Sequence, residues 1–210
     1  ITSISNCFVV GGQPDTYGGI FNLDEEAAQL MKRRGGVGNT MEFLRPSGAL
    51  ANGAPLGPNA GMPLYMDRYS DTTREVQQDG RRGARMLSVH IKHPDAEKFI
   101  DKKMIEGAVT GANVSVKITD QFVKACNSGI DYFQVFPVDK DIYDVINEVE
   151  DSKNEITIDN DVILEGLEYD LLYSGKVIDG VQTYFKKINP KRIQDKLVYN
   201  AWKSAEPGSL

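Results

Sequence analysis

The stretch Gly80-Arg81-Arg82-Gly83-Ala84-Arg85-Met86-Leu87-Ser88-Val89-His90-Ile91 decides how the rest of the sequence is interpreted. Its second half, residues 86–91, is a short apolar run of the kind that forms a buried strand. Its first half is a basic loop in which two glycines bracket two arginines. Glycine lets a backbone pass close to a ligand, and the arginine fork suits a phosphate or a base edge. The loop is therefore a candidate anion- or nucleotide-sensing loop, although taken alone it is better explained as an ordinary exposed turn.

Helical patterns lie on both sides of this strand. Upstream, a helix is predicted from Pro63, because proline suits the first helical position and the apolar residues that follow recur at helical spacing. This face consists of Met62, Tyr65, Met66, Tyr69, Thr73 and Val76. It is typical of a helix packed on a core. A helix–helix dimer seam is the alternative, since methionine and tyrosine are frequent at interfaces.

Further helices are predicted from local start signals. They begin at Asn22, with Glu25 completing a capping box, at His93-Pro94-Asp95, at Thr119-Asp120 and at Asn189-Pro190. Strands are predicted over residues 3–10 and 114–118. Strand and helix patterns therefore alternate, which predicts an α/β fold with a mainly parallel sheet and crossover helices.

The segment 131–187 departs from this alternation. A helix is predicted over residues 142–149, and hairpins are predicted around Asn160-Asp161 and Ser174-Gly175-Lys176. Between residues 139 and 170 there are twelve Asp and Glu against two lysines, whereas residues 31–103 hold thirteen Lys and Arg against eight Asp and Glu. The basic region suits phosphates, and the acidic one reads as a solvated, irregular insert.

Composition excludes several classes of protein. The 210 residues are 40% hydrophobic and 26% charged, with a net charge of −6, which argues against a global nucleic-acid binder. No apolar run approaches the roughly 20 residues that span a bilayer, and no signal peptide is present. Cys7 and Cys126 are too few for a disulfide framework, which favours a reducing, cytoplasmic setting.

Individual motifs are weak when taken one by one. Cys7 lies in an apolar strand, where inert core packing is the default interpretation. Gly35-Gly36-Val37-Gly38 lacks the Lys-Ser/Thr of a P-loop. His90 and His93 lack a Cys or Asp partner at ligand spacing, so no metal site is predicted.

Nine stretches together are more specific than any of them alone. In order along the chain they are Ser5-Asn6-Cys7-Phe8-Val9, Asp15-Thr16-Tyr17-Gly18-Gly19-Ile20, Leu30-Met31-Lys32-Arg33-Arg34-Gly35-Gly36-Val37-Gly38, Leu44-Arg45-Pro46-Ser47-Gly48, Met66-Asp67-Arg68-Tyr69-Ser70-Asp71-Thr72-Thr73-Arg74-Glu75-Val76, Gly80-Arg81-Arg82-Gly83-Ala84, His93-Pro94-Asp95, Thr110-Gly111-Ala112-Asn113-Val114-Ser115-Val116 and Ala201-Trp202-Lys203-Ser204-Ala205-Glu206-Pro207-Gly208. The sequence resembles the large catalytic subunit of ribonucleotide reductase in these stretches, particularly the adenosylcobalamin-dependent (class II) and related class I forms. Residues 131–187 are not covered.

The resemblance implies a fold and an activity. The family's catalytic domain is a ten-stranded α/β barrel built from two five-stranded halves, and residues 1–210 would form the first half, with 131–187 as an insert. The implied enzyme is an oxidoreductase that converts ribonucleotides to 2′-deoxyribonucleotides by thiyl-radical chemistry. The family's finger-loop cysteine and second redox cysteine follow the last matching stretch, so the 210 residues alone are expected to be inactive.

The resemblance also assigns roles to residues of this chain. Cys7 would be the catalytic strand cysteine that protonates the departing 2′-hydroxyl and is then oxidised to a disulfide, which reverses the core interpretation given above. The residues with implied binding roles are Asn6, Gly36 and Arg82 for the substrate, and Asp15, Arg45 and Arg81 for a deoxynucleoside triphosphate effector at the dimer interface.

Cofactors and partners are implied in the same way. Adenosylcobalamin is a possible cofactor, held largely by parts outside these residues, and ATP and deoxynucleoside triphosphates are expected allosteric ligands. A homodimer through the helices near residues 22–34 and 63–77 is expected, together with the other half of the barrel and a thioredoxin- or glutaredoxin-type reductant. The alternative is a non-catalytic nucleotide-binding or dimerisation module derived from the fold. A nucleic-acid-binding domain is a third option, against which the acidic segment 139–170 argues.

Overall fold

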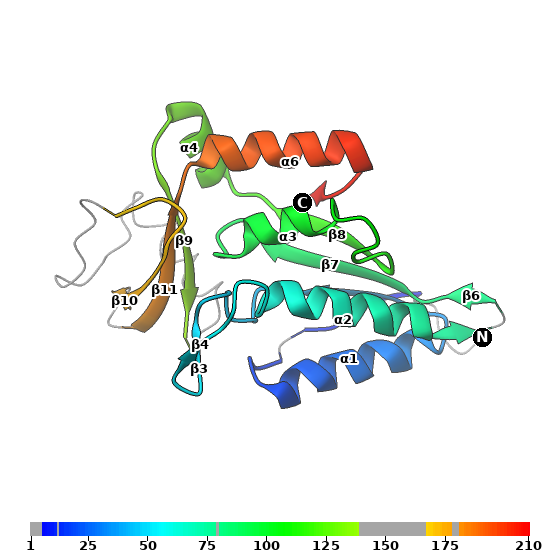
Figure 1. Cartoon of the computed structure of the whole chain (residues 1–210). Coiled ribbons are helices and arrows are strands. Elements are labelled where there is room, and N and C mark those ends of the chain that lie inside the picture. Colours follow the sequence, from blue (N-terminus) through cyan, green and yellow to red (C-terminus); the bar gives the residue numbers. More distant parts are fainter. Residues whose placement is uncertain (1–5, 12, 79, 139–166, 178–180) are drawn as a thin grey trace.

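A computed structural model describes residues 6–11, 13–78, 80–138, 167–177 and 181–210 of the chain (Figure 1). The helices of this part are α1 (Tyr17–Met31), α2 (Met62–Glu75), α3 (Ala96–Lys102), α4 (Asp120–Ser128) and α6 (Pro190–Ser204). The strands are β1 (Cys7–Val9), β2 (Gly36–Thr40), β3 (Leu50–Ala51), β4 (Ala54–Pro55), β5 (Gln77–Gln78), β6 (Arg81–Arg82), β7 (Ala84–His90), β8 (Ala112–Lys117), β9 (Tyr132–Pro137), β10 (Leu172–Val177), β11 (Val181–Ile188) and β12 (Gly208–Ser209).

The central sheet is parallel. Within the described residues it has five strands in the order β1-β2-β7-β8-β12, so each strand pairs with the one before it among the sheet's members. The connections carry α1, α2, α3 and α6, as expected for parallel strands, which need crossovers rather than tight turns. The predicted α/β class and five-stranded parallel half-barrel are confirmed.

Helices cover one face of this sheet (Figure 1). Strand residues that alternate toward them, such as Val37, Leu87 and Val114, are buried in one core with the apolar stripes of the helices. The Met62, Met66 and Tyr69 side chains of α2 are each 0% exposed. The Met/Tyr stripe of this helix is therefore core, as its spacing indicates, and the dimer seam proposed for that stripe is wrong.

The other face of the sheet is open over β1 and the first part of its neighbours. Alternation places Cys7, Val9, Gly38 and Met86 there, and Val9 is 91% exposed while Met86 is 37% exposed. An apolar strand surface of this kind is usually buried on both sides in a parallel sheet. We call it the open face, defined by the outward residues Cys7, Val9, Gly36, Gly38, Ala84, Met86 and Asn113.

A second, antiparallel sheet lies at the carboxyl end of the central strands. Its order is β10-β11-β9, and it is joined to β7's exit by Gln134, whose amide donates to Ile91 O at 2.9 Å. The hairpin predicted around Ser174-Gly175-Lys176 is present as the antiparallel β10–β11 pair. Its turn does not lie at Ser174–Lys176, because Ser174 pairs with Tyr184 inside the ladder. The helix over 142–149 and the hairpin around Asn160-Asp161 lie outside the described residues.

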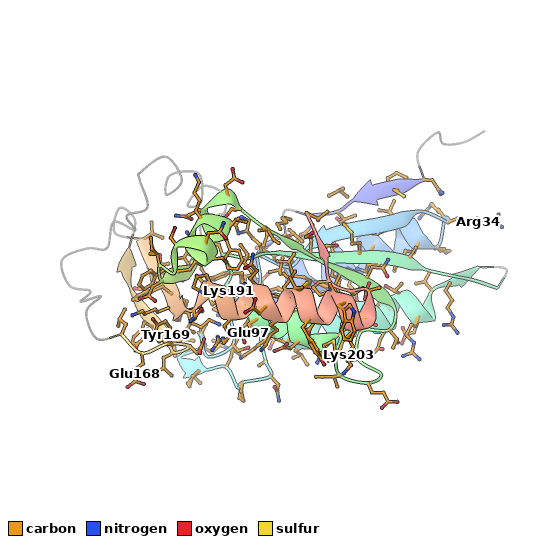
Figure 2. All side chains as sticks on the ribbon, turned by 90° about the horizontal axis from the view of Figure 1, so that it is seen from above. Arg34, Glu97, Glu168, Tyr169, Lys191 and Lys203 are labelled. Carbon is orange, nitrogen blue, oxygen red and sulfur yellow. The ribbon has the colours of Figure 1, made fainter. Side chains whose placement is uncertain are left out.

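Ion pairs tie α6 to α3 across the helical layer. Glu97 accepts from Arg192 at 2.9 Å and from Lys196 at 2.6 Å, and Figure 2 shows its place beside α6. Arg192 also pairs with Asp170 at 2.6 Å. This network holds the last crossover helix so that β12 can reach the edge of β8.

One element boundary and one strand differ from the sequence prediction. Helix α1 begins at Tyr17 rather than after Asn22, because Thr16 is the N-cap and its hydroxyl accepts from Gly19 N at 3.1 Å. Strand β2 was not predicted. Its first three residues are Gly-Val-Gly, and glycine has no side chain that could show the alternation of a strand.

None of the helices among the described residues is long and apolar enough to span a membrane.

Candidate functional site

Cys7 lies on the open face beside two small residues. It pairs in register with Gly36 of β2, which pairs with Ala84 of β7. A Cβ added to Gly36 would lie 3.4 Å from Cys7 Sγ and 4.0 Å from Ala84 Cβ. A larger side chain at position 36 would therefore contact the sulfur and cover part of it. Glycine leaves the thiol accessible to a ligand on this face.

Asn6 joins the same row through its backbone. Its carbonyl oxygen accepts from Gly36 N at 2.8 Å, which continues the β1–β2 ladder by one residue. The structure thus brings together Asn6, Cys7 and Gly36, three of the residues singled out from the sequence. This row lies at the amino ends of the parallel strands.

The basic hairpin is at this same end of the sheet. Strands β5 and β6 pair as Gln77 with Arg82 and Gln78 with Arg81, and the hairpin base is closed by Gly83 N donating to Val76 O at 2.9 Å. Ala84, the next residue, belongs to the Cys7 row. Arg82 is exposed, and the hairpin projects from the end of the molecule opposite the antiparallel sheet (Figure 1).

Asp15 and Arg45 form a second group. Arg45 Nε donates to Asp15 Oδ2 at 2.5 Å, and one η nitrogen donates to Leu50 O at 2.7 Å. Both side chains remain partly exposed, at 34% for Arg45 and 21% for Asp15. Tyr65 is close by: burial raises the pKa of its phenol, with smaller contributions from Tyr17 and Asp15. The group is thus a partly exposed Arg45–Asp15 ion pair with the Tyr65 phenol nearby.

The two groups lie at opposite ends of α1 and α2. Asp15 precedes the start of α1, whereas the Arg81–Arg82 hairpin follows the end of α2 (Figure 1). Helix α2 has 14 residues, so at about 1.5 Å per residue it separates them by roughly 20 Å. One protomer therefore does not bring Asp15 and Arg45 together with the Arg81–Arg82 hairpin.

Charged residues that were not singled out from the sequence lie on the open-face side of the sheet at the carboxyl ends of its strands. Lys117 Nζ lies 2.8 Å from the buried Glu42 carboxylate, and Lys92 Nζ donates to Gln121 Oε1 at 2.8 Å. Burial, together with Lys117 and Lys92, lowers the pKa of His90 to about 3. The imidazole is therefore neutral at physiological pH.

No group of three His, Cys, Asp or Glu among the described residues could hold a metal ion. Both imidazoles are buried, and His93 uses both ring nitrogens in hydrogen bonds within the protein. Neither histidine is therefore exposed as a ligand for a metal ion.

The chain was compared with known proteins. A family model described as the barrel domain of ribonucleotide reductase matches residues 5–210. The chain belongs to this family. The ribonucleotide reductase match runs through the segment 131–187, which the nine stretches left uncovered, and through β12 at the edge of the sheet.

Relatives support the same assignment. The chain is 29% identical over 211 residues to a vitamin B12-dependent ribonucleoside-diphosphate reductase of Thermoplasma acidophilum, covering 99% of this chain and 22% of that protein. It is 33% identical over 125 residues to one of Mycobacterium tuberculosis, covering 58% and 18%. It is 29% identical over 106 residues to a ribonucleoside-diphosphate reductase large subunit of Arabidopsis thaliana, covering 50% and 13%. The chain spans about a fifth or less of the length of these relatives.

Two further residues of the open face were not singled out from the sequence. Met86 and Asn113 share the open face with Cys7, two register positions further along the strands. Alternation within the predicted strands could have placed them there, once it was known which face the helices cover. That choice of face depends on the packing of α1 and α2 and cannot be read from the strands alone.

Proposed function

We propose that the chain forms part of the catalytic barrel of a ribonucleotide reductase, an enzyme that converts ribonucleotides to 2′-deoxyribonucleotides. The observation that carries this proposal is the accessible thiol of Cys7 on the open face, next to Gly36 and at the same end as the Arg81–Arg82 hairpin. In this arrangement the substrate ribose lies against the Cys7 row. Asn6, Gly36 and Arg82 contact the nucleotide.

The role of Cys7 follows from the chemistry of losing a hydroxyl group. After a thiyl radical has removed the 3′-hydrogen, the 2′-hydroxyl leaves as water, and this requires a proton donor beside it. Cys7 supplies that proton. Its sulfur then forms a disulfide with a second thiol, and the two electrons released reduce the substrate. The second thiol and the radical come from residues other than Cys126, which is buried in α4.

Regulation is proposed at Asp15 and Arg45. Arg45 pairs with the phosphates of a deoxynucleoside triphosphate, and Asp15 receives a sugar hydroxyl. Because these residues and the Arg81–Arg82 hairpin lie at opposite ends of α1 and α2, a homodimer with antiparallel helices unites them, each protomer's Asp15 facing the partner's hairpin. Exposed Tyr17, Phe21 and Leu64 on α1 and α2 are the contact residues that this dimer would bury.

Cofactor and reductant complete the proposal. The vitamin B12 dependence in the names of two relatives supports adenosylcobalamin as the source of the radical. A thioredoxin- or glutaredoxin-type protein would reduce the disulfide after each turnover, which suits a reducing compartment such as the cytoplasm.

The test replaces the sulfur of Cys7 with oxygen. In enzyme reconstituted with the polypeptide that supplies the radical and the second thiol, Cys7→Ser should lower steady-state turnover by at least about a hundredfold, because serine neither donates a proton as readily nor forms a disulfide. Cys126→Ser is the matched control and should turn over normally. Normal steady-state turnover of Cys7→Ser would remove Cys7 from the mechanism, whereas no turnover with the unchanged chain would favour a non-catalytic nucleotide-binding module.

A further inference from the structure

The backbone around Arg45 is held on both sides by a segment 48–49 residues further along the chain. This segment is His93-Pro94-Asp95, which links β7 to α3. His93 bonds to the residue before Arg45, and Asp95 bonds to the residue after Pro46. His93 is 0% exposed and Asp95 is 2% exposed, so neither side chain is available to contact a ligand.

His93 acts on the peptide group that joins Leu44 to Arg45. Its Nδ1 accepts from Asp95 N at 3.0 Å, so the ring proton resides on Nε2, which donates to Leu44 O at 2.9 Å. Burial lowers the pKa of His93 to about 4, and this one tautomer therefore persists at neutral pH. The carbonyl of Leu44, and with it the direction of the Arg45 backbone, is fixed.

Asp95 fixes the other side. One carboxylate oxygen, Oδ2, accepts from Ser47 N at 2.7 Å and lies 3.0 Å from Ser47 Oγ. That hydroxyl is also 2.7 Å from Ala60 O. Hydrogen bonds to an ionised acceptor are about twice as strong as neutral ones, and these are shielded from water.

The third side is closed by Gly61. Its φ is +76°, and a Cβ at this position would lie 2.8 Å from Arg45 O and 3.0 Å from Ser47 N. The start of α2 therefore packs directly on the Arg45 backbone. The backbone conformation at Arg45-Pro46 is thus fixed by these contacts, whereas the Arg45 side chain is partly exposed.

We propose that His93 and Asp95 are positioning residues for Arg45, which they hold ready to bind the phosphates of a deoxynucleoside triphosphate effector. This inference rests on the proposed function of Arg45. A long arginine side chain loses considerable freedom on binding, and a fixed backbone reduces that cost before the ligand arrives. The clamp thus acts on effector affinity through Arg45, without touching the nucleotide.

The experiment is calorimetric titration of the chain with each of the four deoxynucleoside triphosphates, with thermal unfolding measured in parallel. Asp95→Ala should weaken binding about tenfold, the scale of a lost charged hydrogen bond. Asp95→Asn keeps an acceptor oxygen toward Ser47 and should restore binding to within about threefold. Ser47→Ala removes only the hydroxyl and serves if Asp95→Ala does not fold; it should weaken binding about threefold.

A matched control separates positioning from stability. Asn200→Ala also removes a buried side-chain hydrogen bond, to Ile100 O, on α6, and should lower the melting temperature while leaving affinity unchanged. Wild-type affinity in both Asp95→Ala and Ser47→Ala, or no rescue by Asp95→Asn, would overturn the inference alone. Failure of the unchanged chain to bind any of the four nucleotides would overturn the effector role of Arg45 itself.

Discussion

His90 and His93 show how burial decides the chemistry of a single residue. His90 is the last residue of β7, and His93 follows it by three positions; their sequence context predicts no metal site. Burial lowers the pKa of His90 to about 3 and of His93 to about 4. Both are neutral in the folded chain at pH 7, and both would titrate near the ordinary histidine value of about 6.5 when unfolded.

The sign of the pH dependence follows. Below pH 6.5 the two histidines bind protons in the unfolded chain but not in the folded chain. The free energy of unfolding is therefore highest above pH 6.5 and falls as pH decreases toward the pKa values of the folded state. Each histidine should cost about 1.4 kcal/mol per pH unit in this window. Urea unfolding at pH 7.0 and pH 5.5 checks this, and a His90→Asn variant should show about half the slope. A free energy of unfolding that stays constant over this range would contradict the neutral assignment.

The position of Cys7 could not be predicted from its local sequence. A lone cysteine in an apolar strand reads as core, and only the resemblance of neighbouring stretches suggested chemistry. The structure shows why the local pattern misleads: β1 is an edge strand whose outer side chains meet no helix, so apolar residues such as Val9 are exposed. Whether a strand residue is buried depends on what covers the sheet, and residues 6–11 carry no information about that.

At the scale of elements, Asp24 joins α1, α2 and the central strands. Its Oδ1 accepts from Arg85 of β7 at 2.8 Å, and its Oδ2 lies 3.2 Å from Arg68 Nε and 2.7 Å from the Thr72 hydroxyl. Arg85 is 0% exposed, donates to Asn39 of β2 at 2.8 Å and lies over the Tyr69 ring. The same carboxylate thus serves one buried and one solvated arginine.

This difference gives a stability prediction. Asp24→Asn leaves the Arg85 guanidinium buried without its counter-charge and should lower the free energy of unfolding by about 3–5 kcal/mol. Arg68→Met removes only the half-exposed partner and should cost about 1 kcal/mol or less. Urea denaturation of the two variants measures both values. Equal losses would mean that the buried pair contributes no more than the exposed one.

Elements with local signals were predictable, and those that depend on pairing were not. Pro63 and the caps Thr119 and Asn189 placed α2, α4 and α6 correctly, because capping is decided by three or four adjacent residues. Strand β2 is held by ladders on both sides, to β1 and to β7. The sequence of β2 itself does not indicate either pairing.

For the whole molecule, the proposed dimer makes a separate prediction. Leu64→Glu places a charge on the exposed outer side of α2 and should weaken self-association about tenfold or more, the scale of losing one buried leucine contact. Deoxynucleotide affinity should fall with it, since the site takes its hairpin from the partner. Analytical ultracentrifugation with nucleotide titration measures both.

A distant exposed residue provides the control. Trp202 is 80% exposed on α6, away from α1 and α2, and Trp202→Glu should leave self-association unchanged. Loss of association in Trp202→Glu and not in Leu64→Glu would move the interface to α6.

The order of the central sheet has a consequence for how the chain acquires its structure. Because β1, β2, β7 and β8 pair in the sequence in which they occur, each new strand finds its partner already formed as synthesis proceeds, and loop closure is short at every early step. The exception is β12, which joins β8 only after about ninety further residues have been made. Until then the β8 edge stays unpaired, and this is the stage at which a nascent chain is most exposed to mispairing with a neighbour.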